Sequence, residues 1–262
     1  MKSPSLFNLI RLKFHPLYRL RKFGWYRKFQ SLIDPDVTIR IYGFKVYLKF
    51  LRDLSMVLSP MGKEHETLET VASLLAQNKI NVFIDVGANV GMYSWLAKAY
   101  NVDFIFMFEP DPINCRLLQR SLFANHFQNI FLVPFAASSF AGVENFYPDL
   151  ASGATGSLAL NPHSLHLAYG VKNPIAVPTL PLDTYVDFCT NKMVMIKIDV
   201  EGAESSVFAG AMRLIQQVYP LIIVECFDSS KLDLFKPLGY SLQPLDANGN
   251  FLLTPPRFAK PN

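Results

Sequence analysis

Residues Ile84 to Gly91 read IDVGANVG and directly follow the apolar residues Val82 and Phe83. An apolar run that ends in an acid, continues through glycines and then takes a helical pattern is typical of a strand–loop–helix unit. Such a unit places a carboxylate and bare backbone N–H groups at the carboxyl edge of a sheet, where open α/β folds bind nucleotide-like ligands. The stretch therefore predicts an α/β fold with a nucleotide site.

The rest of the chain alternates in the same way, and this alternation predicts a doubly wound, mostly parallel sheet. A hairpin is expected around Tyr42-Gly43, and an irregular region with short strands is expected from Phe140 to Asp183. The expected strands cover residues 81–86, 104–108, 130–135, 193–198, 221–225, 238–245 and 250–254, and the expected helices cover 64–75, 91–100, 112–125 and 203–217.

The composition fits one large domain with an extension. The chain has 262 residues, of which 50% are hydrophobic, and its mean hydropathy is +0.19. It contains no run near the about 18 apolar residues of a membrane-spanning helix. Arg11 and Lys13 interrupt the apolar residues near the start, so no secretory leader is expected. The three cysteines are widely spaced and form no CxxC pair, which indicates reduced thiols in the cytoplasm.

The charge is unevenly distributed. Residues 1–33 carry eight Lys or Arg and no acid, so the remaining residues hold 17 basic and 21 acidic side chains, a net charge of −4. We divide the chain into a basic extension, residues 1–60, and a catalytic domain, residues 61–262. The basic segment either packs its aromatic side chains on the domain or lies on an anionic membrane surface. No nucleic-acid-binding module accompanies it, so nucleic acid is not an expected partner.

Two further motifs place carboxylates at the same sheet edge. Asn89 takes the position of the middle glycine of a GxGxxG loop, which its tolerance of left-handed backbone allows. Glu109 ends the next strand, where a carboxylate can accept hydrogen bonds from both hydroxyls of a ribose. Asp199 and Glu201 follow the strand 193–198, in the motif KIDVEGAE, and Glu204 favours the dipole of the next helix.

These motifs together resemble the FkbM-type methyltransferases. IDVGANVG, FEPDP, TLPLD (Thr179 to Asp183), KIDVEGAE and PLIIVE occur in that family's order, and the similarity covers about residues 64 to 230. The resemblance implies a class I, Rossmann-like methyltransferase fold with a seven-stranded sheet, its last strand antiparallel, and S-adenosylmethionine as cofactor. The implied cofactor-binding residues are Asp85, Gly87, Ala88, Asn89 and Gly91 around the methionine end, Glu109 at the ribose, and Pro110, Asp111, Ala136 and Ala137 around the adenine.

The expected reaction moves a methyl group to a hydroxyl of a small acceptor, such as a sugar, a polyketide or another secondary metabolite. A hydroxyl needs a base during attack, and the candidates are Asp199, Glu201, His163 and His166. The histidines lie in the irregular region, which is expected to form the lid over the acceptor. The sequence contains no compact metal-ligand motif, so no metal is predicted. Two alternatives remain: an NAD-dependent oxidoreductase, and an inactive, membrane-peripheral member of the fold.

Overall fold

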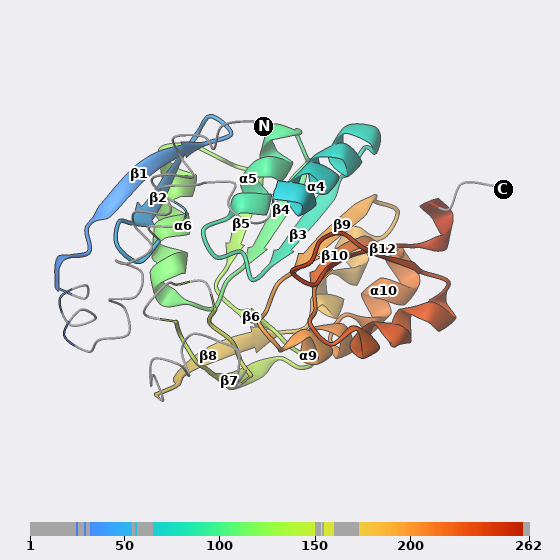
Figure 1. Ribbon diagram of the computed structural model, residues 1–262. Helices are drawn as coiled ribbons and strands as arrows, with labels where there is room; N and C mark the ends of the chain where they lie inside the picture. The colour runs from blue at the N-terminus through green and yellow to red at the C-terminus, as the bar shows by residue number, and fades with distance from the viewer. Residues whose placement is uncertain are drawn as a thin grey trace, which may run out of the picture.

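The computed structural model describes residues 25, 29, 32–53, 56, 65–149, 153, 155–159 and 173–258. Within them, a central seven-stranded sheet has helices on both faces, and a two-stranded hairpin and a three-stranded sheet lie beside it (Figure 1). This architecture confirms the predicted doubly wound α/β fold. The helices are α4 (His65–Gln77), α5 (Met92–Ala99), α6 (Pro112–Ala124), α8 (Val186–Cys189), α9 (Glu204–Ala209) and α10 (Met212–Val218), with 3-10 turns η1 (Leu182–Tyr185), η2 (Ser229–Leu238) and η3 (Pro256–Phe258).

The central sheet consists of β3 (Val82–Val86), β4 (Phe104–Phe108), β5 (Ile130–Val133), β9 (Val194–Ile198), β10 (Leu221–Glu225), β11 (Ser241–Pro244) and β12 (Asn250–Thr254). Their order is β11-β12-β10-β9-β3-β4-β5. All neighbours from β10 to β5 are parallel, whereas β12 is antiparallel to both β10 and β11, as predicted for the last strand. The chain winds outward in opposite directions from β3 and β9, so a ligand crevice is expected where these two strands end.

The strands of the central sheet divide their side chains between two cores. Val82, Ile84 and Val86 of β3 pack in one core with α9 and α10, whereas Phe83 packs in the other core with α4 and α5. This division follows from the period of two residues along a strand. Asp85 therefore lies on the same face of the sheet as Phe83, under α5.

The prediction of one helix over residues 203–217 is wrong, because the structure has two helices, α9 and α10, in that range. At the break, a Cβ on Gly210 would overlap the backbone carbonyl oxygen of Ser138, which packs against it. Asp183 also donates its backbone N–H to the Gly210 carbonyl at 2.8 Å, and its carboxylate accepts from the backbone N–H of Leu214 at 2.8 Å. A side chain from a distant segment thus caps α10 and ends the continuous helix.

The predicted hairpin is confirmed as β1 (Asp36–Ile41) and β2 (Phe44–Lys49), which lie beside α6 (Figure 1). The backbone N–H of Tyr47 donates to Ser121 Oγ at 2.9 Å, and the N–H of Lys45 donates to Asn125 Oδ1 at 2.9 Å. Val46 is fully buried and belongs to the same core as α4 and α5. The hairpin therefore adds apolar surface to the core of the main domain.

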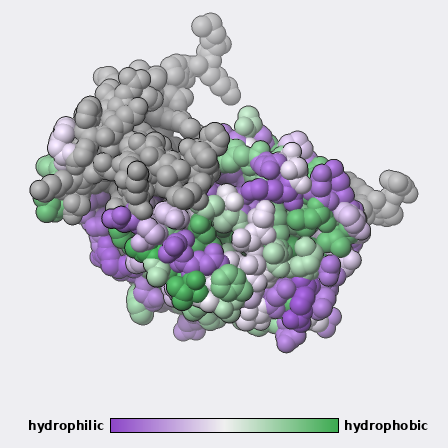
Figure 2. Space-filling view, turned by 90° about the horizontal axis from the view of Figure 1, so that it is seen from below, coloured by the Kyte–Doolittle hydropathy of each residue, from purple (hydrophilic) through white to green (hydrophobic). Residues whose placement is uncertain are grey.

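The irregular region supplies the second sheet, formed by β6 (Ala136–Ala137), β7 (Gly142–Phe146) and β8 (Ile175–Leu180). Its short strands were expected between Phe140 and Asp183, although β6 begins before that range. Seen from the side of β7 and β8, hydrophobic and hydrophilic residues are interspersed over the surface (Figure 2). Phe140 and Val143 are among the exposed apolar residues of this segment.

Two expectations drawn from composition can be compared with the described residues. No helix found in these ranges has both the length and the apolar character that a membrane crossing requires. Cys115, Cys189 and Cys226, all within the described ranges, are free thiols, and Cys189 and Cys226 are buried. The absence of pairing among these three cysteines is as predicted.

Candidate functional site

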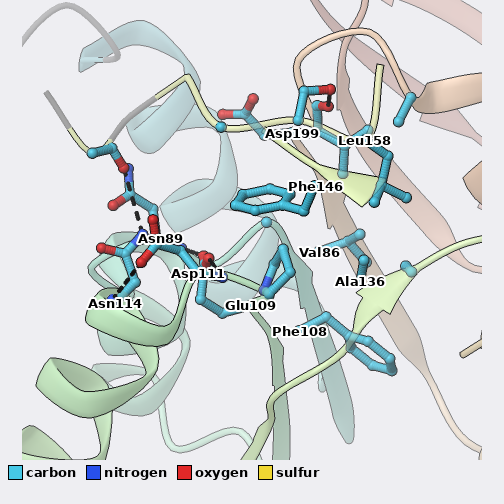
Figure 3. Close-up of a pocket in the computed structure, with 18 residues that line it drawn as sticks. Val86, Asn89, Phe108, Glu109, Asp111, Asn114, Ala136, Phe146, Leu158 and Asp199 are labelled. Atoms are coloured by element: carbon cyan, nitrogen blue, oxygen red, sulfur yellow. Dashed lines mark hydrogen bonds between the residues drawn. The ribbon is translucent and has the colours of Figure 1, made fainter. Parts of the chain in front are cut away.

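A cleft lies at the carboxyl ends of β3, β4 and β9 and contains about 550 Å³ of empty space, part of it open solvent. Asp111 and Asn114 lie on one side and Ala136 and Leu158 on the other (Figure 3). The lining residues are Val86, Gly87, Asn89, Phe108, Glu109, Pro110, Asp111, Asn114, Ala136, Ala137, Phe146, Gly153, Gly156, Ser157, Leu158, Asp199, Val200 and Ala203.

Gly87 brings the first loop against the end of β9. Its φ is +78°, and a Cβ at this position would overlap the carbonyl oxygen of Asp199. The backbone N–H of Asp199 in turn donates to the carbonyl oxygen of Val86 at 2.9 Å. Asn89 also has a left-handed backbone, with φ of 53°, as its substitution for glycine requires. The wall of the cleft at Gly87 is therefore formed by backbone, because glycine has no side chain there.

Glu109 is a buried acid of the cleft, with 4% of its surface exposed. Its carboxylate accepts from the backbone N–H of Asn89 at 2.6 Å and from that of Asp111 at 2.8 Å. Burial, followed by the charge of Asp111, raises the pKa of Glu109 to about 7. A carboxylate has about four acceptor positions, so Glu109 retains capacity for hydroxyl donors of a ligand.

The two sides of the cleft differ in chemistry. Asp111 caps α6, its carboxylate accepting from the backbone N–H of Ile113 at 2.7 Å. Ala136 and Ala137 of β6 are buried and present only methyl groups to the cleft. These small side chains leave room for a flat apolar ring, whereas the Asp111 side is polar.

Three residues of the predicted first loop, Asp85, Ala88 and Gly91, do not line the cleft. Asp85 points to the α5 face and accepts from Ser94, from the backbone N–H at 3.1 Å and from Oγ at 2.6 Å. Burial raises the pKa of Asp85 to about 6, although the hydrogen bonds from Ser94 and the charge of Lys197 act in the opposite direction. Asp85 thus fixes the start of α5 and contacts the cleft through no atom of its own.

Of the two candidate bases in KIDVEGAE, Asp199 lines the cleft and Glu201 does not. Lys197, which is buried, places Nζ 3.6 Å from Asp199 Oδ2. Glu201 lies in the following turn with φ of 52°, and its burial, together with the charge of Asp199, raises its pKa. Glu204 accepts from the backbone N–H of Gly202 at 2.6 Å and pairs with a lysine of η2, so it holds that turn in place.

The predicted histidines, His163 and His166, lie outside the described residues. Ten cleft residues were not predicted: Val86, Phe108, Asn114, Phe146, Val200, Ala203 and, from the segment after β7, Gly153, Gly156, Ser157 and Leu158. This segment had been assigned to the acceptor lid because of its small residues. Ser157 Oγ donates to the carbonyl oxygen of Val200 at 3.0 Å, which ties the segment to the turn after β9. Gly153 and Gly156 were the available signal in the sequence, because glycine lets the backbone approach a ligand closely.

Within the described ranges, no group of three or more His, Cys, Asp or Glu side chains is arranged to hold a metal ion. The acids of the cleft are instead bonded to backbone N–H groups, as for Glu109 and Asp111. The remaining acceptor positions of these carboxylates suit an organic ligand with hydroxyl donors.

A glycine loop at the switch point of a parallel sheet, with a buried acid at the end of the next strand, defines the class of nucleotide-binding α/β enzymes to which class I methyltransferases belong. The family model of the methyltransferase FkbM domain matches residues 85–236, more than half of the chain. The chain therefore belongs to the FkbM methyltransferase family, which confirms the resemblance read from its motifs. No curated protein sequence matches the chain.

Among solved structures, the chain is similar to the FkbM methyltransferase of Methylobacillus flagellatus, with 20% identity and a TM-score of 0.46, over 67% of this chain and 43% of that one. It thus spans less than half of that protein. Precorrin-6y C5,15-methyltransferase of Geobacter metallireducens shows 12% identity and a TM-score of 0.43, over 74% and 89% of the two chains. M. jannaschii TYW2 in complex with AdoMet shows 11% identity and a TM-score of 0.44, over 84% of each chain.

The family implies S-adenosylmethionine as cofactor, and the residues of the cleft fit its parts. The buried carboxylate of Glu109 suits a ribose diol, and the methyl groups of Ala136 and Ala137 suit an adenine ring. The donor set of the cleft therefore agrees with this cofactor.

Proposed function

We propose that this chain transfers the methyl group of S-adenosylmethionine to a hydroxyl oxygen of a small-molecule acceptor. The observation that carries the proposal is one cleft that contains the glycine loop at Gly87, the buried carboxylate of Glu109 and, at its other end, the carboxylate of Asp199. Family membership supports the methyl transfer. The choice of an oxygen acceptor rests on the carboxylate bases and remains part of the proposal.

When bound, the cofactor supplies a methyl group that its sulfonium already activates. The chain's residues bind and orient the two reactants and exclude water. Glu109 accepts from the ribose hydroxyls, and Asp111, with Pro110, flanks the adenine. Asp199 is the base that takes the hydroxyl proton of the acceptor, because its carboxylate lines the cleft and Lys197 lies close by.

The other candidate bases have weaker support. Glu201 does not line the cleft, and the raised pKa of its carboxyl makes it a poorer proton acceptor near neutral pH. His163 and His166 stay candidates from the sequence alone. We keep the division into an extension, residues 1–60, and a catalytic domain, residues 61–262, as part of this proposal.

We propose a small acceptor, such as a sugar or a polyketide hydroxyl, and no nucleic acid. The charged side chains that line the cleft, Glu109, Asp111 and Asp199, are all acidic. Residues 34–262 carry a net charge of −4, as counted above, so a polyphosphate chain would be repelled from this face. Phe146, an aromatic ring in the cleft wall, offers an apolar surface for a ring-shaped ligand.

Calorimetric titration of the full chain tests the cofactor proposal. We expect saturable heat with S-adenosylmethionine and with S-adenosylhomocysteine, and none with NAD. Folding of the same sample is checked by a cooperative thermal transition. Heat with NAD alone would favour the oxidoreductase alternative, and folded protein that binds none of the three would overturn the proposal.

A second proposal concerns the basic extension: we propose a cytoplasmic protein that contacts an anionic membrane surface. Trp25, Phe29, Leu32 and Ile33 are apolar residues that are 61%, 48%, 75% and 50% exposed, and their spacing in the sequence is that of one face of a helix. The cationic sequence around them supplies the attraction that such a face needs.

We expect the full chain to sediment with vesicles that contain phosphatidylglycerol, and not with pure phosphatidylcholine vesicles. The double substitution Trp25→Ser and Phe29→Ser should reduce the bound fraction severalfold, because it removes apolar area that enters the interface. Phe123→Ser is the matched control, since Phe123 is an exposed apolar residue on α6, outside residues 1–60. Equal sedimentation with both kinds of vesicle, or an equal loss in the control, would refute this contact.

A further inference from the structure

Arg52 and Asp53 directly follow the hairpin, far in sequence from the matched family domain, yet they are buried, with 3% and 4% of their surface exposed. Arg52 Nε donates to Asp53 Oδ1 at 2.9 Å. The turn that carries them is held by two further bonds: the backbone N–H of Arg52 donates to Asp34 Oδ2 at 2.9 Å, and that of Lys49 donates to Asp53 Oδ2 at 2.7 Å. These bonds within residues 34–53 therefore fix the position of the turn and of the guanidinium.

The other side of the guanidinium contacts two residues that line the cleft. Arg52 Nη2 donates to Asn114 Oδ1, a bond that joins residues far apart in sequence. A Cβ on Gly153 would lie 2.5 Å from Arg52 Nε, so the backbone of Gly153 packs directly on the guanidinium. Asn114 Nδ2 in turn donates to the carbonyl oxygen of Gly153 at 3.4 Å. Arg52 thus joins the α6 wall of the cleft to the segment after β7.

The charge of Arg52 also lies near the acids of the cleft. Asp53, Asp111 and Glu109 all raise the pKa of Arg52, so the cation reciprocally favours the ionised form of Glu109. Asp111 acts on Glu109 in the opposite direction. The Cys115 thiol lies on the same side and donates to the Glu109 carbonyl oxygen at 2.9 Å. Arg52 is the cation in this group and offsets the repulsion between the two carboxylates.

We propose that Arg52 is a positioning residue of the cofactor site: it holds Asn114 and Gly153 in the cleft wall and places a cation near Glu109. The inference rests on the proposed function and assigns a residue outside the matched domain to its site. Arg52 thus adds a supporting residue from the extension to a cleft whose lining residues all belong to the family domain.

The test uses the full chain titrated with S-adenosylhomocysteine at pH 6, 7 and 8. Removing Arg52 alone would leave Asp53 as a buried, uncompensated charge, so the main variant is Arg52→Met with Asp53→Leu, which replaces the pair by apolar side chains. Arg52→Lys keeps the charge but loses the planar, forked contact with Asn114. Arg40→Met, on the exposed strand β1, is the control.

For the double variant we expect a shift of about one unit upward in the pH at which affinity is half-maximal. Its Kd at pH 6 should then be about tenfold higher than that of the wild type, since one pKa unit is a factor of ten in the ionised fraction. Arg52→Lys should keep the wild-type pH midpoint, with a Kd about fivefold higher through the lost hydrogen bond. Arg40→Met should match the wild type throughout.

Folding of each variant is followed by its thermal transition. A folded double variant with the wild-type Kd and the wild-type pH midpoint would show that Arg52 is structural only, and would overturn this inference alone. If the double variant does not fold, Arg52→Lys decides, and a wild-type Kd for it would overturn the contact with Asn114. A folded wild type without heat would overturn the proposed function, and this inference with it.

Discussion

Replacing Glu109 by glutamine should abolish most of the cofactor affinity. Both carboxylate oxygens of Glu109 accept from backbone N–H groups, those of Asn89 and Asp111, so an amide nitrogen at either position would place a donor against a donor. The ribose hydroxyls would also lose a charged acceptor, and hydrogen bonds to charged groups contribute about 1.5–3 kcal/mol each. We expect Kd for S-adenosylhomocysteine at pH 8 to rise roughly a hundredfold, measured by calorimetry.

Glu69→Gln is the matched control, because Glu69 is an exposed acid on α4 that takes no part in the cleft. It should bind with the wild-type Kd. Glu109→Gln with unchanged affinity and a normal thermal transition would remove the ribose role from Glu109.

The Glu109 carboxyl also determines the pH dependence that we expect for cofactor binding to the wild type. Its pKa is raised to about 7 in the cofactor-free protein, while hydroxyl donors favour the charged form and so lower that pKa on binding. Binding then releases a proton below pH 7, and affinity should rise about tenfold per pH unit up to that value and level off above it. In Glu109→Gln this slope should be lost.

The strand and helix pattern could be predicted because each parallel strand of the central sheet is a short, mostly apolar run between loop residues. The break between α9 and α10 could not, because Asp183 caps α10 from a segment distant in sequence. A helical pattern in residues 203–217 contains no sign of that contact. The close packing of the Ser138 backbone against Gly210 is likewise a tertiary contact, which the local sequence does not show.

The predicted cofactor residues show the same difference between positions set by the local sequence pattern and positions set by tertiary contacts. Gly87, Asn89 and Glu109 were predictable, since a loop and a strand end at the switch point must face the crevice. Asp85 belongs to the same motif, but the alternation of side chains along β3 turns it to the α5 face, and the sequence does not show which face holds the ligand. Arg52 contacts Asn114 only through the folded chain, so no spacing rule could place it in the site.

Gly87→Ala should be the most damaging single substitution in the cleft. Its left-handed backbone costs an alanine about 1–2 kcal/mol, and its Cβ would overlap the carbonyl oxygen of Asp199, a backbone atom that cannot turn away. Relieving the overlap must separate the ends of β3 and β9, which share a parallel ladder through residues such as Val86 and Ile198. Overpacking of this kind costs about 1–3 kcal/mol more. We expect a loss of about 2–5 kcal/mol in the free energy of unfolding, measured in urea, together with loss of cofactor binding.

Gly43→Ala separates the two causes. Gly43 has a φ of +87°, close to that of Gly87, but a Cβ there would meet no atom within 4 Å. Its alanine variant should therefore pay the backbone cost of about 1–2 kcal/mol alone and bind S-adenosylhomocysteine like the wild type. The difference between the two variants measures the contact between the first loop and Asp199. If both lost equal stability and both bound the cofactor, the close approach of Gly87 to Asp199 would have no energetic weight. Because that approach sets the distance between the cofactor loop and the proposed base, we expect the two variants to differ in binding even more than in stability.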